Sequence, residues 1–331
     1  MAVRLITDKN LWDGFIDSSP YGLVFHKWDF LKLAEKHTGY KLLPYGIYKG
    51  EQLVCVFPLF YKKILGVRQL FSPPPKSGIP YLGPVLQESY DNAKQVKKES
   101  IINSIVLEID AEINKLAPNY FSAVLVPGLL DIRPFQWLGY SVEPGYTYTC
   151  SLAPDLNAIW KGFSTVCRQN IRKGEALNCT LETSGDVSGI TGRLTERYSE
   201  QGLNLTLSAD YLSEVLKAYP DNFKLNCLLD NGKLVGSVLI QAYKRYIAWI
   251  GLSKMKDKKY VYANEFMIWQ LMRQAKAQGF KRFEISGANK YSLCKFRSKF
   301  NPRLDMYFTV SKKDVLGKTA EAFYYRFVKR K

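Results

Sequence analysis

The stretch Ala263-Asn-Glu-Phe-Met-Ile-Trp-Gln-Leu-Met-Arg-Gln-Ala-Lys-Ala-Gln-Gly279 decides the fold of this chain, together with the fifty or so residues around it. Its apolar side chains recur on one face of a helix, which Gly279 can close from the C′ position. Phe283-Glu-Ile-Ser-Gly287 then reads as a short strand with a glycine turn. A short basic and aromatic helix over residues 293–300 and a strand over 303–310 complete an α/β unit.

The same order of elements occurs earlier in the chain. A hairpin over residues 42–62, turning at Lys49-Gly50-Glu51, matches a hairpin over 225–243 that turns at Asn231-Gly232. Each hairpin is followed by a further strand, a long amphipathic helix, a strand, a short helix containing Phe135 or Phe296, and a last strand. We therefore predict two copies of one mixed α/β fold, a domain over residues 1–152 and another over 153–331, with a ligand cleft between them.

Length and charge constrain the class of protein. The 331 residues suit two globular domains, and 47 Lys and Arg against 30 Asp and Glu give a net charge of +17. Such a charge favours polyanionic partners, namely nucleic acid, nucleotide-sugar phosphates, coenzyme phosphates or an anionic membrane surface. A solvated basic surface that serves solubility is the alternative.

Cysteine usage and hydropathy indicate the compartment. The six cysteines form no C-x-x-C pair, which favours reduced thiols in the cytoplasm. The first residues lack the apolar core of a signal peptide, and no apolar run reaches the roughly 18 residues that span a bilayer. We expect a cytoplasmic protein, with peripheral contact at the inner face of an anionic membrane left open.

The sequence lacks the signatures of covalent and metal catalysis. There is no G-x-S-x-G motif, and His26 and His37 are the only histidines, so neither a Ser-His arrangement nor a metal ligand set is expected.

Basic residues of the second half are candidates for phosphate binding. Arg168 and Arg172 lie at i and i+4 of a predicted helix, so they share a face and could clamp one phosphate, with Lys173 beside them. A solvated basic helix face is the alternative.

Two further groups are candidates for the chemistry itself. Arg297 can donate two parallel hydrogen bonds to a phosphate or an oxyanion. The alternative is that Phe296 and Phe300 belong to the core and the cations between them point outward to solvent. Glu284 could act as a base at the end of its strand. Strand alternation would turn this carboxylate away from the side that its apolar neighbours face.

Five motifs, in order, carry a family resemblance over nearly the whole chain. They are Phe25-His-Lys-Trp-Asp-Phe-Leu-Lys32, Tyr81-Leu-Gly-Pro-Val85, Cys167-Arg-Gln-Asn-Ile-Arg-Lys173, Asn264 to Gly279 with Phe283-Glu-Ile-Ser-Gly287, and Lys295-Phe-Arg-Ser-Lys-Phe300. With them the chain resembles the FemAB-like branch of the GNAT acyltransferase superfamily, the peptidoglycan-bridge aminoacyltransferases and their relatives. The resemblance implies two tandem GNAT-like domains, each a mixed sheet flanked by helices.

The resemblance also implies an activity and a set of site residues. It implies transfer of an acyl or aminoacyl group from a carrier, aminoacyl-tRNA or acyl-CoA, to an amine of a cell-envelope precursor or amino-sugar. Lys32, Arg168 and Arg172 match residues that hold the precursor's diphosphate, and we expect three further substrate contacts, Tyr81, Asn264 and Lys299. The family's oxyanion-stabilising lysine is replaced here by Arg297, with Lys295 as a neighbour that could substitute, and Gln87 stands where an aspartate base is often found.

The donor and the presence of catalysis stay open at this point. The sequence has no glycine-rich pyrophosphate loop, which disfavours acyl-CoA. A non-catalytic protein that binds nucleotide-sugars or RNA is the alternative function. No tightly bound cofactor, metal or stable protein partner is expected. An amphipathic helix with Leu316, Ala320, Phe323 and Phe327 is predicted to pack on the protein, or else to contact a membrane surface or RNA.

Overall fold

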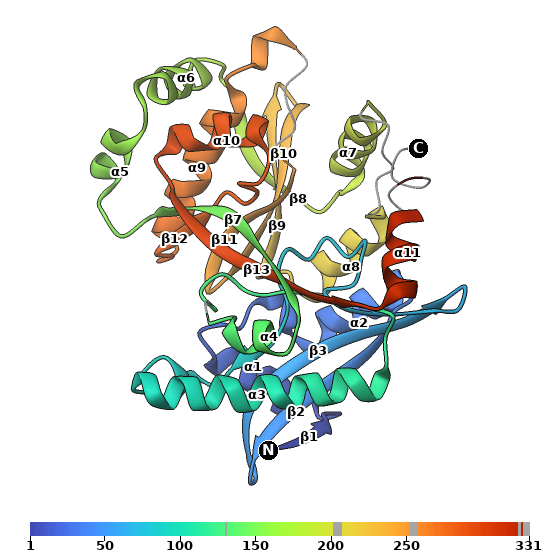
Figure 1. Ribbon diagram of the computed structural model, residues 1–331. Helices are drawn as coiled ribbons and strands as arrows, with labels where there is room; N and C mark the ends of the chain where they lie inside the picture. Colours follow the sequence, from blue (N-terminus) through green and yellow to red (C-terminus); the bar gives the residue numbers. More distant parts are fainter. Residues whose placement is uncertain (130, 201–206, 252–256, 324–325, 327–331) are drawn as a thin grey trace. The chain divides into compact units, whose positions relative to one another are not determined.

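The computed structural model describes residues 1–331 apart from 130, 201–206, 252–256, 324–325 and 327–331 (Figure 1). The chain forms two compact units. Unit 1 contains Met1–Gly145 together with Met306–Lys331, and unit 2 contains Tyr146–Asp305. In the described residues no helix is long and apolar enough to cross a membrane.

Unit 1 is a mixed sheet flanked by helices. Its strands follow the order β1-β2-β3-β4-β6-β13, antiparallel except for the parallel pair β4 and β6. The strands are β1 (Ala2–Leu5), β2 (Lys41–Lys49), β3 (Gln52–Ile64), β4 (Val67–Ser72), β5 (Val85–Leu86), which pairs with β3, β6 (Tyr120–Val124) and β13 (Arg303–Lys313). The helices are α1 (Lys9–Ser18), α2 (Trp28–Thr38), α3 (Gln95–Leu116), α4 (Arg133–Trp137) and α11 (Val315–Phe323), with short 3-10 turns at Val24–His26 and Glu88–Tyr90.

Unit 2 repeats this plan. Its strands follow the order β8-β9-β10-β11-β12-β7, and the parallel pair is β11 and β12. The strands are β7 (Ser141–Ser151), β8 (Thr180–Ser184), β9 (Phe223–Asp230), β10 (Lys233–Tyr243), β11 (Arg245–Gly251) and β12 (Arg282–Glu284). The helices are α5 (Leu156–Gly162), α6 (Thr165–Glu175), α7 (Ser188–Glu200), α8 (Ala209–Ala218), α9 (Ala263–Ala277) and α10 (Tyr291–Arg297), with 3-10 turns at Lys258–Tyr260 and Ser298–Phe300.

The predicted repeat is confirmed by the order and pairing of the elements. In each unit an antiparallel hairpin leads to the first strand of a parallel pair, β4 or β11, and a long helix, α3 or α9, leads to the second strand, β6 or β12. A short helix, α4 or α10, then leads to a last strand. The predicted fold class, two α/β domains each with a mixed sheet flanked by helices, is therefore correct.

The last strand of each copy pairs with the sheet of the other copy's unit. β7, which ends the first copy, pairs with β12 of unit 2, with Phe283 opposite Cys150. β13, which ends the second copy, pairs with β6 of unit 1, with Val310 opposite Ala123. The domain boundary expected at residues 152 and 153 places β13 and α11 in the second domain, whereas in the structure residues 306–331 belong to unit 1.

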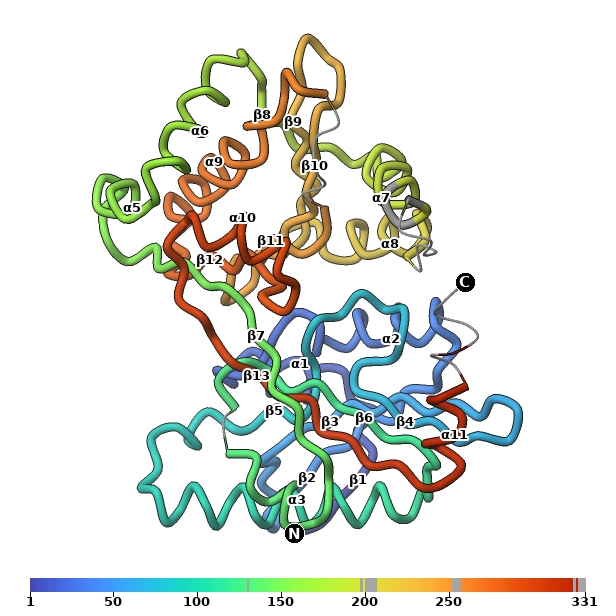
Figure 2. The backbone as a smooth tube through the Cα atoms, turned by 45° about the horizontal axis from the view of Figure 1, so that its top comes forward, coloured from blue at the N-terminus to red at the C-terminus, as the bar shows by residue number. Residues whose placement is uncertain are grey.

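Helix α9 is the centre of the core of unit 2. All five residues of its predicted apolar face are fully buried: Met267, Ile268, Leu271, Met272 and Ala275. Gly279 has a φ of +86° and its amide donates to the carbonyl of Lys276, so it ends the helix as predicted. Helix α6 packs closely against the other side of α9 (Figure 2), and Gly174 of α6 allows this close approach. A Cβ atom at position 174 would lie only 2.5 Å from Cβ of Phe266.

Candidate active site

The parallel strands of unit 2 diverge at their carboxyl ends. β11 and β12 pair through Tyr246 with Phe283 and through Ile247 with Glu284. β11 then continues beside β10 to Gly251. The chain after β12 follows β7 instead, because the amide of Ile285 donates to the carbonyl of Tyr148 at 2.9 Å. The carboxyl ends of parallel strands are where α/β sheets commonly bind ligands, so this is the candidate site.

Glu284 is a buried carboxylate at the carboxyl end of the β11–β12 pair. Only 2% of it is exposed, and Oε1 accepts a 2.9 Å hydrogen bond from Oγ1 of Thr147 on β7. The guanidinium of Arg245, at the start of β11, lies 3.9 Å from Oε2. Strand alternation predicts that Glu284 faces away from the side of Phe283 and Ile285, and in the structure all three side chains are buried.

Arg297 holds the turn that follows β12. Ser286 and Gly287 have φ values of +62° and +53°, and Nη1 of Arg297 donates to the carbonyl of Gly287 at 2.5 Å. A Cβ atom on Gly287 would lie 2.4 Å from the same nitrogen, so a side chain here would displace the guanidinium, and the positive φ itself favours glycine. The predicted cation of this site therefore lies next to the end of β12, partly buried.

Two further side chains lie beside Arg297 and were not predicted. Cys294 donates from Sγ to the carbonyl of Ala288 at 3.2 Å and contacts the Tyr148 side chain. Burial and the hydrogen bond to Cys294 raise the pKa of Tyr148, while the charge of Arg297 acts in the opposite direction. Tyr148 could have been predicted from the repeated Tyr-Thr pattern of β7. Its partner Cys294 lies on a helix 146 positions further along the chain, and no local signal indicates that the two side chains meet.

Lys295 and Lys299 have different surroundings. Lys295 is exposed on α10, where it can meet a ligand from solvent. Nζ of Lys299 pairs with Oε1 of Glu265 at 3.1 Å and lies 5.6 Å from the centre of the Phe296 ring. Glu265 is itself buried in the first turn of α9 and also accepts a 2.9 Å hydrogen bond from Asn170. The charge of Lys299 thus balances a buried carboxylate of the protein.

Arg168 and Arg172 make separate contacts on α6. Arg168 turns back to the segment before its helix, where Nη1 donates to the carbonyl of Lys161 at 3.0 Å and to that of Phe163. Arg172 is exposed, with its guanidinium carbon 5.8 Å from the centre of the Trp160 ring. The helix and the shared face are as predicted, and the phosphate clamp stays a prediction. Asn264 is nearly buried at the start of α9.

The two predicted site residues of unit 1 also differ in exposure. Lys32 is exposed on α2 and forms an ion pair with Glu35. Tyr81 is buried and makes an edge-to-face contact with Tyr307, with 4.9 Å between ring centres. Their substrate contacts, like the predicted cleft between the domains, stay predictions.

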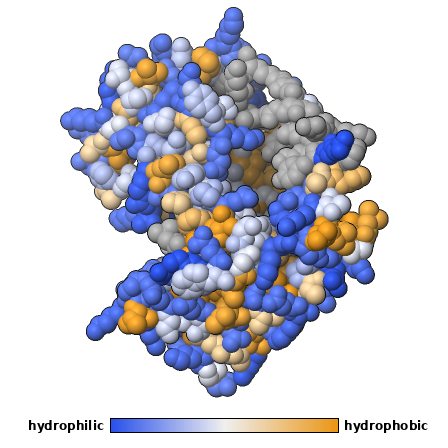
Figure 3. Space-filling model, viewed as in Figure 1, coloured by the Kyte–Doolittle hydropathy of each residue, from blue (hydrophilic) through white to orange (hydrophobic). Residues whose placement is uncertain are grey.

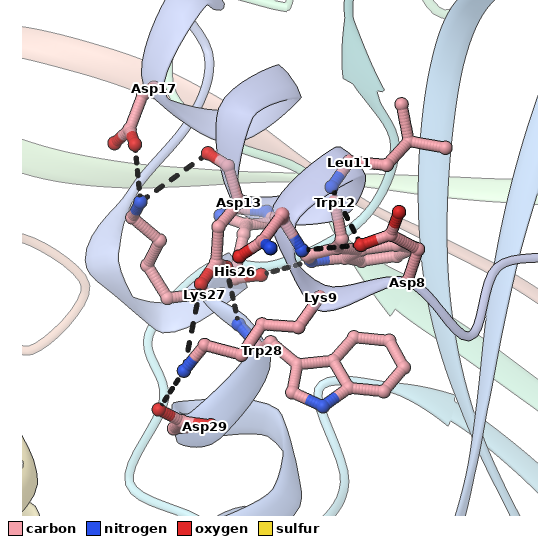
Figure 4. A network of polar contacts seen from close by, with 11 residues as sticks. Asp8, Lys9, Leu11, Trp12, Asp13, Asp17, His26, Lys27, Trp28 and Asp29 are labelled. Atoms are coloured by element: carbon pink, nitrogen blue, oxygen red, sulfur yellow. Dashed lines mark hydrogen bonds and ion pairs between the residues drawn. The ribbon is translucent and has the colours of Figure 1, made fainter.

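The motif that begins at Phe25 has a structural role in unit 1 (Figure 4). Nε1 of Trp12 donates to the carbonyl of His26 at 2.6 Å, and Nζ of Lys27 donates to Asp17 at 2.6 Å. The amide of Trp28 donates to Asp13 at 2.8 Å, and burial raises the pKa of that carboxyl. These bonds fix α1 against α2.

Comparison with known proteins identifies the class of fold. Residues 161–291 match the family model of the acetyltransferase (GNAT) domain. This range contains the divergent pair β11 and β12 with Glu284, so the candidate site lies within the residues that match this model. A search of curated protein sequences gave no match.

Solved structures extend the likeness to nearly the whole chain. FemX superposes with a TM-score of 0.68 at 13% identity, covering 93% of this chain and 97% of FemX. L-PGS from Bacillus licheniformis gives 0.56 at 12% identity, with 97% of both chains covered. A tandem GNAT protein from the clavulanic acid biosynthesis pathway gives 0.52 at 9% identity, covering 94% of this chain and 98% of that one. The predicted fold, two tandem GNAT-like domains, is confirmed: the chain shares its fold with FemX and with a tandem GNAT protein, and residues 161–291 match the GNAT family model.

Proposed function

We propose that this protein is an N-acyltransferase that moves an acyl or aminoacyl group from a carrier to an amine. One observation carries the proposal: in the GNAT domain, a parallel strand pair diverges at the buried carboxylate Glu284, with the guanidinium of Arg297 at the turn that follows. A base and a cation are thus placed at the carboxyl end of one strand.

The chemistry assigns a role to each of these groups. The amine nitrogen attacks the carbonyl carbon of the carrier ester or thioester, and a C–N bond forms as the C–O or C–S bond breaks. Glu284 accepts the proton of the amine and returns it to the leaving oxygen or sulfur, and its bond from Thr147 orients the carboxylate. Arg297 stabilises the oxyanion that develops on the carbonyl oxygen, the role of lysine in the resembled family.

The donor we propose is aminoacyl-tRNA or acyl-CoA, and the net charge of +17 suits the phosphates of both. The first turn of α9 supports tRNA over CoA. Glu265 is buried there and paired with Lys299, so a carboxylate of the chain already occupies the helix end at which a pyrophosphate would be favoured.

The acceptor we propose is an amine of a cell-envelope precursor or amino-sugar. The likeness to FemX supports it, as does the resemblance of five motifs to the peptidoglycan-bridge enzymes. Of the cations among the predicted site residues, Lys32, Arg172 and Lys295 are exposed. We propose that these three contact the phosphate groups of donor or acceptor, and that Arg168 and Lys299 shape the site from within.

A second candidate function is binding of RNA or nucleotide-sugars without catalysis. The charge of +17 favours it, and so does the arginine that replaces the family's lysine. Binding alone would not require a carboxylate at the divergence of β11 and β12, and for this reason we place it second.

A transfer assay tests the proposal. The protein is incubated with radiolabelled aminoacyl-tRNA or acyl-CoA and a panel of amines that includes nucleotide-linked amino-sugars. We expect labelled amide from one donor class, lost in Arg297→Ala and retained in Arg273→Ala, which changes an exposed arginine of α9. No product from either donor, together with salt-dependent tRNA binding that survives Arg297→Ala, would establish the binding function instead.

A further inference from the structure

Unit 1 exposes a group of large apolar side chains on two neighbouring elements. Leu65, in the turn between β3 and β4, is 99% exposed, and Val315 and Phe323 of α11 are 81% and 60% exposed. Ile64 and Leu316 are also exposed. α11 packs against β4, and both ribbon views draw its start near this hairpin (Figure 1; Figure 2). We call Leu65, Val315, Leu316 and Phe323 the apolar tip.

The orientation of α11 is fixed by contacts of its other face. A Cβ atom on Gly317 would lie 1.9 Å from the carbonyl oxygen of Asn119, so the helix touches the body of unit 1 through a glycine. Asp314 accepts hydrogen bonds from the Gly317 amide at 2.8 Å and from Nδ2 of Asn119 at 2.7 Å. Glu321, one turn further on, pairs with Lys313 at 2.7 Å. The helix is therefore held with its apolar side chains outward.

This arrangement corrects the sequence prediction for the helix. Leu316 and Phe323 were expected on the packed face, yet both are exposed, and Gly317 and Glu321 face the protein instead. The expected packing of Phe327 lies outside the described residues. The helix packs as predicted, through the opposite face.

Leu65 has an unusual conformation for its residue type. Its φ is +48°, and Gly66 follows with +85°. For comparison, the turn between β9 and β10 of unit 2 has Asn231 at +50° and Gly232 at +78°, the pair that such turns favour. A leucine in this region costs roughly 1 kcal/mol more than a residue that tolerates it. Packing of the Leu65 side chain against the protein does not offset this cost, because the side chain is fully exposed.

Basic residues border the apolar tip. Lys62 and Lys63 lie near the end of β3, Arg68 lies in β4 close to the turn, and Lys318 lies on α11. Lys63 and Lys318 are exposed, whereas the two carboxylates of the helix, Asp314 and Glu321, are engaged in the contacts described above. In the space-filling view, hydrophobic side chains at this edge of unit 1 adjoin hydrophilic ones (Figure 3).

We propose that the apolar tip is a docking site for the surface of an anionic lipid bilayer. Apolar side chains that enter the headgroup region, flanked by lysines that meet lipid phosphates, are the chemistry of peripheral membrane binding. Charge selects this occupant over an apolar protein partner, because the border is basic and the whole chain carries +17. The inference stands apart from the transferase proposal, since it uses no residue of the candidate site.

Vesicle flotation with the full chain tests the docking site. The probes are phosphatidylcholine vesicles with and without phosphatidylglycerol. We expect binding to the anionic vesicles alone, weakened at least about tenfold by Leu65→Asn or Phe323→Ser, since each removes an apolar side chain that would enter the headgroup region. Lys63→Glu should also weaken binding, and more so at low salt.

Matched variants separate binding from folding. Leu65→Asn installs a residue type that tolerates this φ, as Asn231 does between β9 and β10, so thermal stability should be retained or raised. Val96→Ser, which changes a 77% exposed valine of α3 in the same unit, should bind like the wild type. Equal binding to neutral vesicles, or undiminished binding by Leu65→Asn and Phe323→Ser, would overturn the proposal. A dimer in sedimentation that Leu65→Asn dissociates would also overturn it, in favour of a second copy as the occupant.

Discussion

Oγ1 of Thr147 donates a 2.9 Å hydrogen bond to Oε1 of Glu284, and this bond joins β7 to β12 where the parallel pair of unit 2 diverges. Both groups are buried, so removal of the hydroxyl leaves a carboxylate oxygen without this donor. We expect Thr147→Val to lower the free energy of unfolding by about 1 to 3 kcal/mol. Urea denaturation measures the change. Thr180→Val, at an exposed residue of β8, is the control, and an equal change in both variants would contradict the prediction.

Gly279 and Gly287 both have a positive φ but differ in the space around them, so substitutions at the two positions distinguish a conformational effect from a steric one. Gly279 has open space around its Cβ position, whereas the same position on Gly287 is occupied by Arg297. We expect Gly279→Ala to cost about 1 kcal/mol of stability without affecting transfer. Gly287→Ala should carry the same conformational cost and also displace the guanidinium, so its transfer rate should fall. Equal activity in the two variants would show that the position of Arg297 is unimportant.

Cysteine reactivity should follow burial. Burial raises the pKa of Cys150 and of Cys167 to about 12. At pH 8 their thiolate fraction would be about one part in ten thousand, so iodoacetamide should leave both unmodified in the native protein. Cys294 and Cys179 are partly exposed and should react first, as peptide mass spectrometry would show. Early modification of Cys150 would contradict the buried position of β7.

Asp314 should make the attachment of α11 sensitive to acid. The hydrogen bond from the Gly317 amide, followed by that from Asn119, lowers the pKa of Asp314 below its usual value. A lowered pKa in the folded state contributes stability above the ordinary carboxyl pKa of about 4, and this contribution is lost as pH falls through the folded value. We expect Asp314→Ala to melt lower than the wild type at pH 7 and nearly equal to it at about pH 3. A difference that persists at low pH would contradict this origin.

Local signals predicted much of the fold. Asn231-Gly232 forms the turn that such a pair favours, and Gly279 ends α9 through a positive φ, because both effects are set by neighbouring residues. The repeat was visible because each copy keeps the same succession of periodicities. The exchange of β7 and β13 could not be seen, since it depends on which strand edge each one meets, and no residue near either strand carries that information.

In the candidate site, too, residue types could be read from the local sequence, whereas their surroundings depend on residues distant in the chain. Arg297 and Glu284 were predicted from residue type and position, but the burial of Glu284 depends on elements distant in sequence, such as β7 with Thr147. Arg168 was assigned to a ligand because its helical face is basic, yet its guanidinium donates to carbonyls of the preceding segment. Leu65 escaped notice because leucine is not a turn residue, and its conformation becomes informative only with its φ angle.

The central claim is that Glu284 accepts the proton of the attacking amine. Glu284→Gln keeps the shape of the side chain and removes the base, and Glu175→Gln is the control at an exposed carboxylate of α6. Single-turnover transfer from a labelled donor, with far-ultraviolet circular dichroism to verify folding, measures the step directly. The account predicts that Glu284→Gln slows transfer about a hundredfold or more while Glu175→Gln reacts like the wild type. A folded Glu284→Gln variant with an unchanged rate would contradict it.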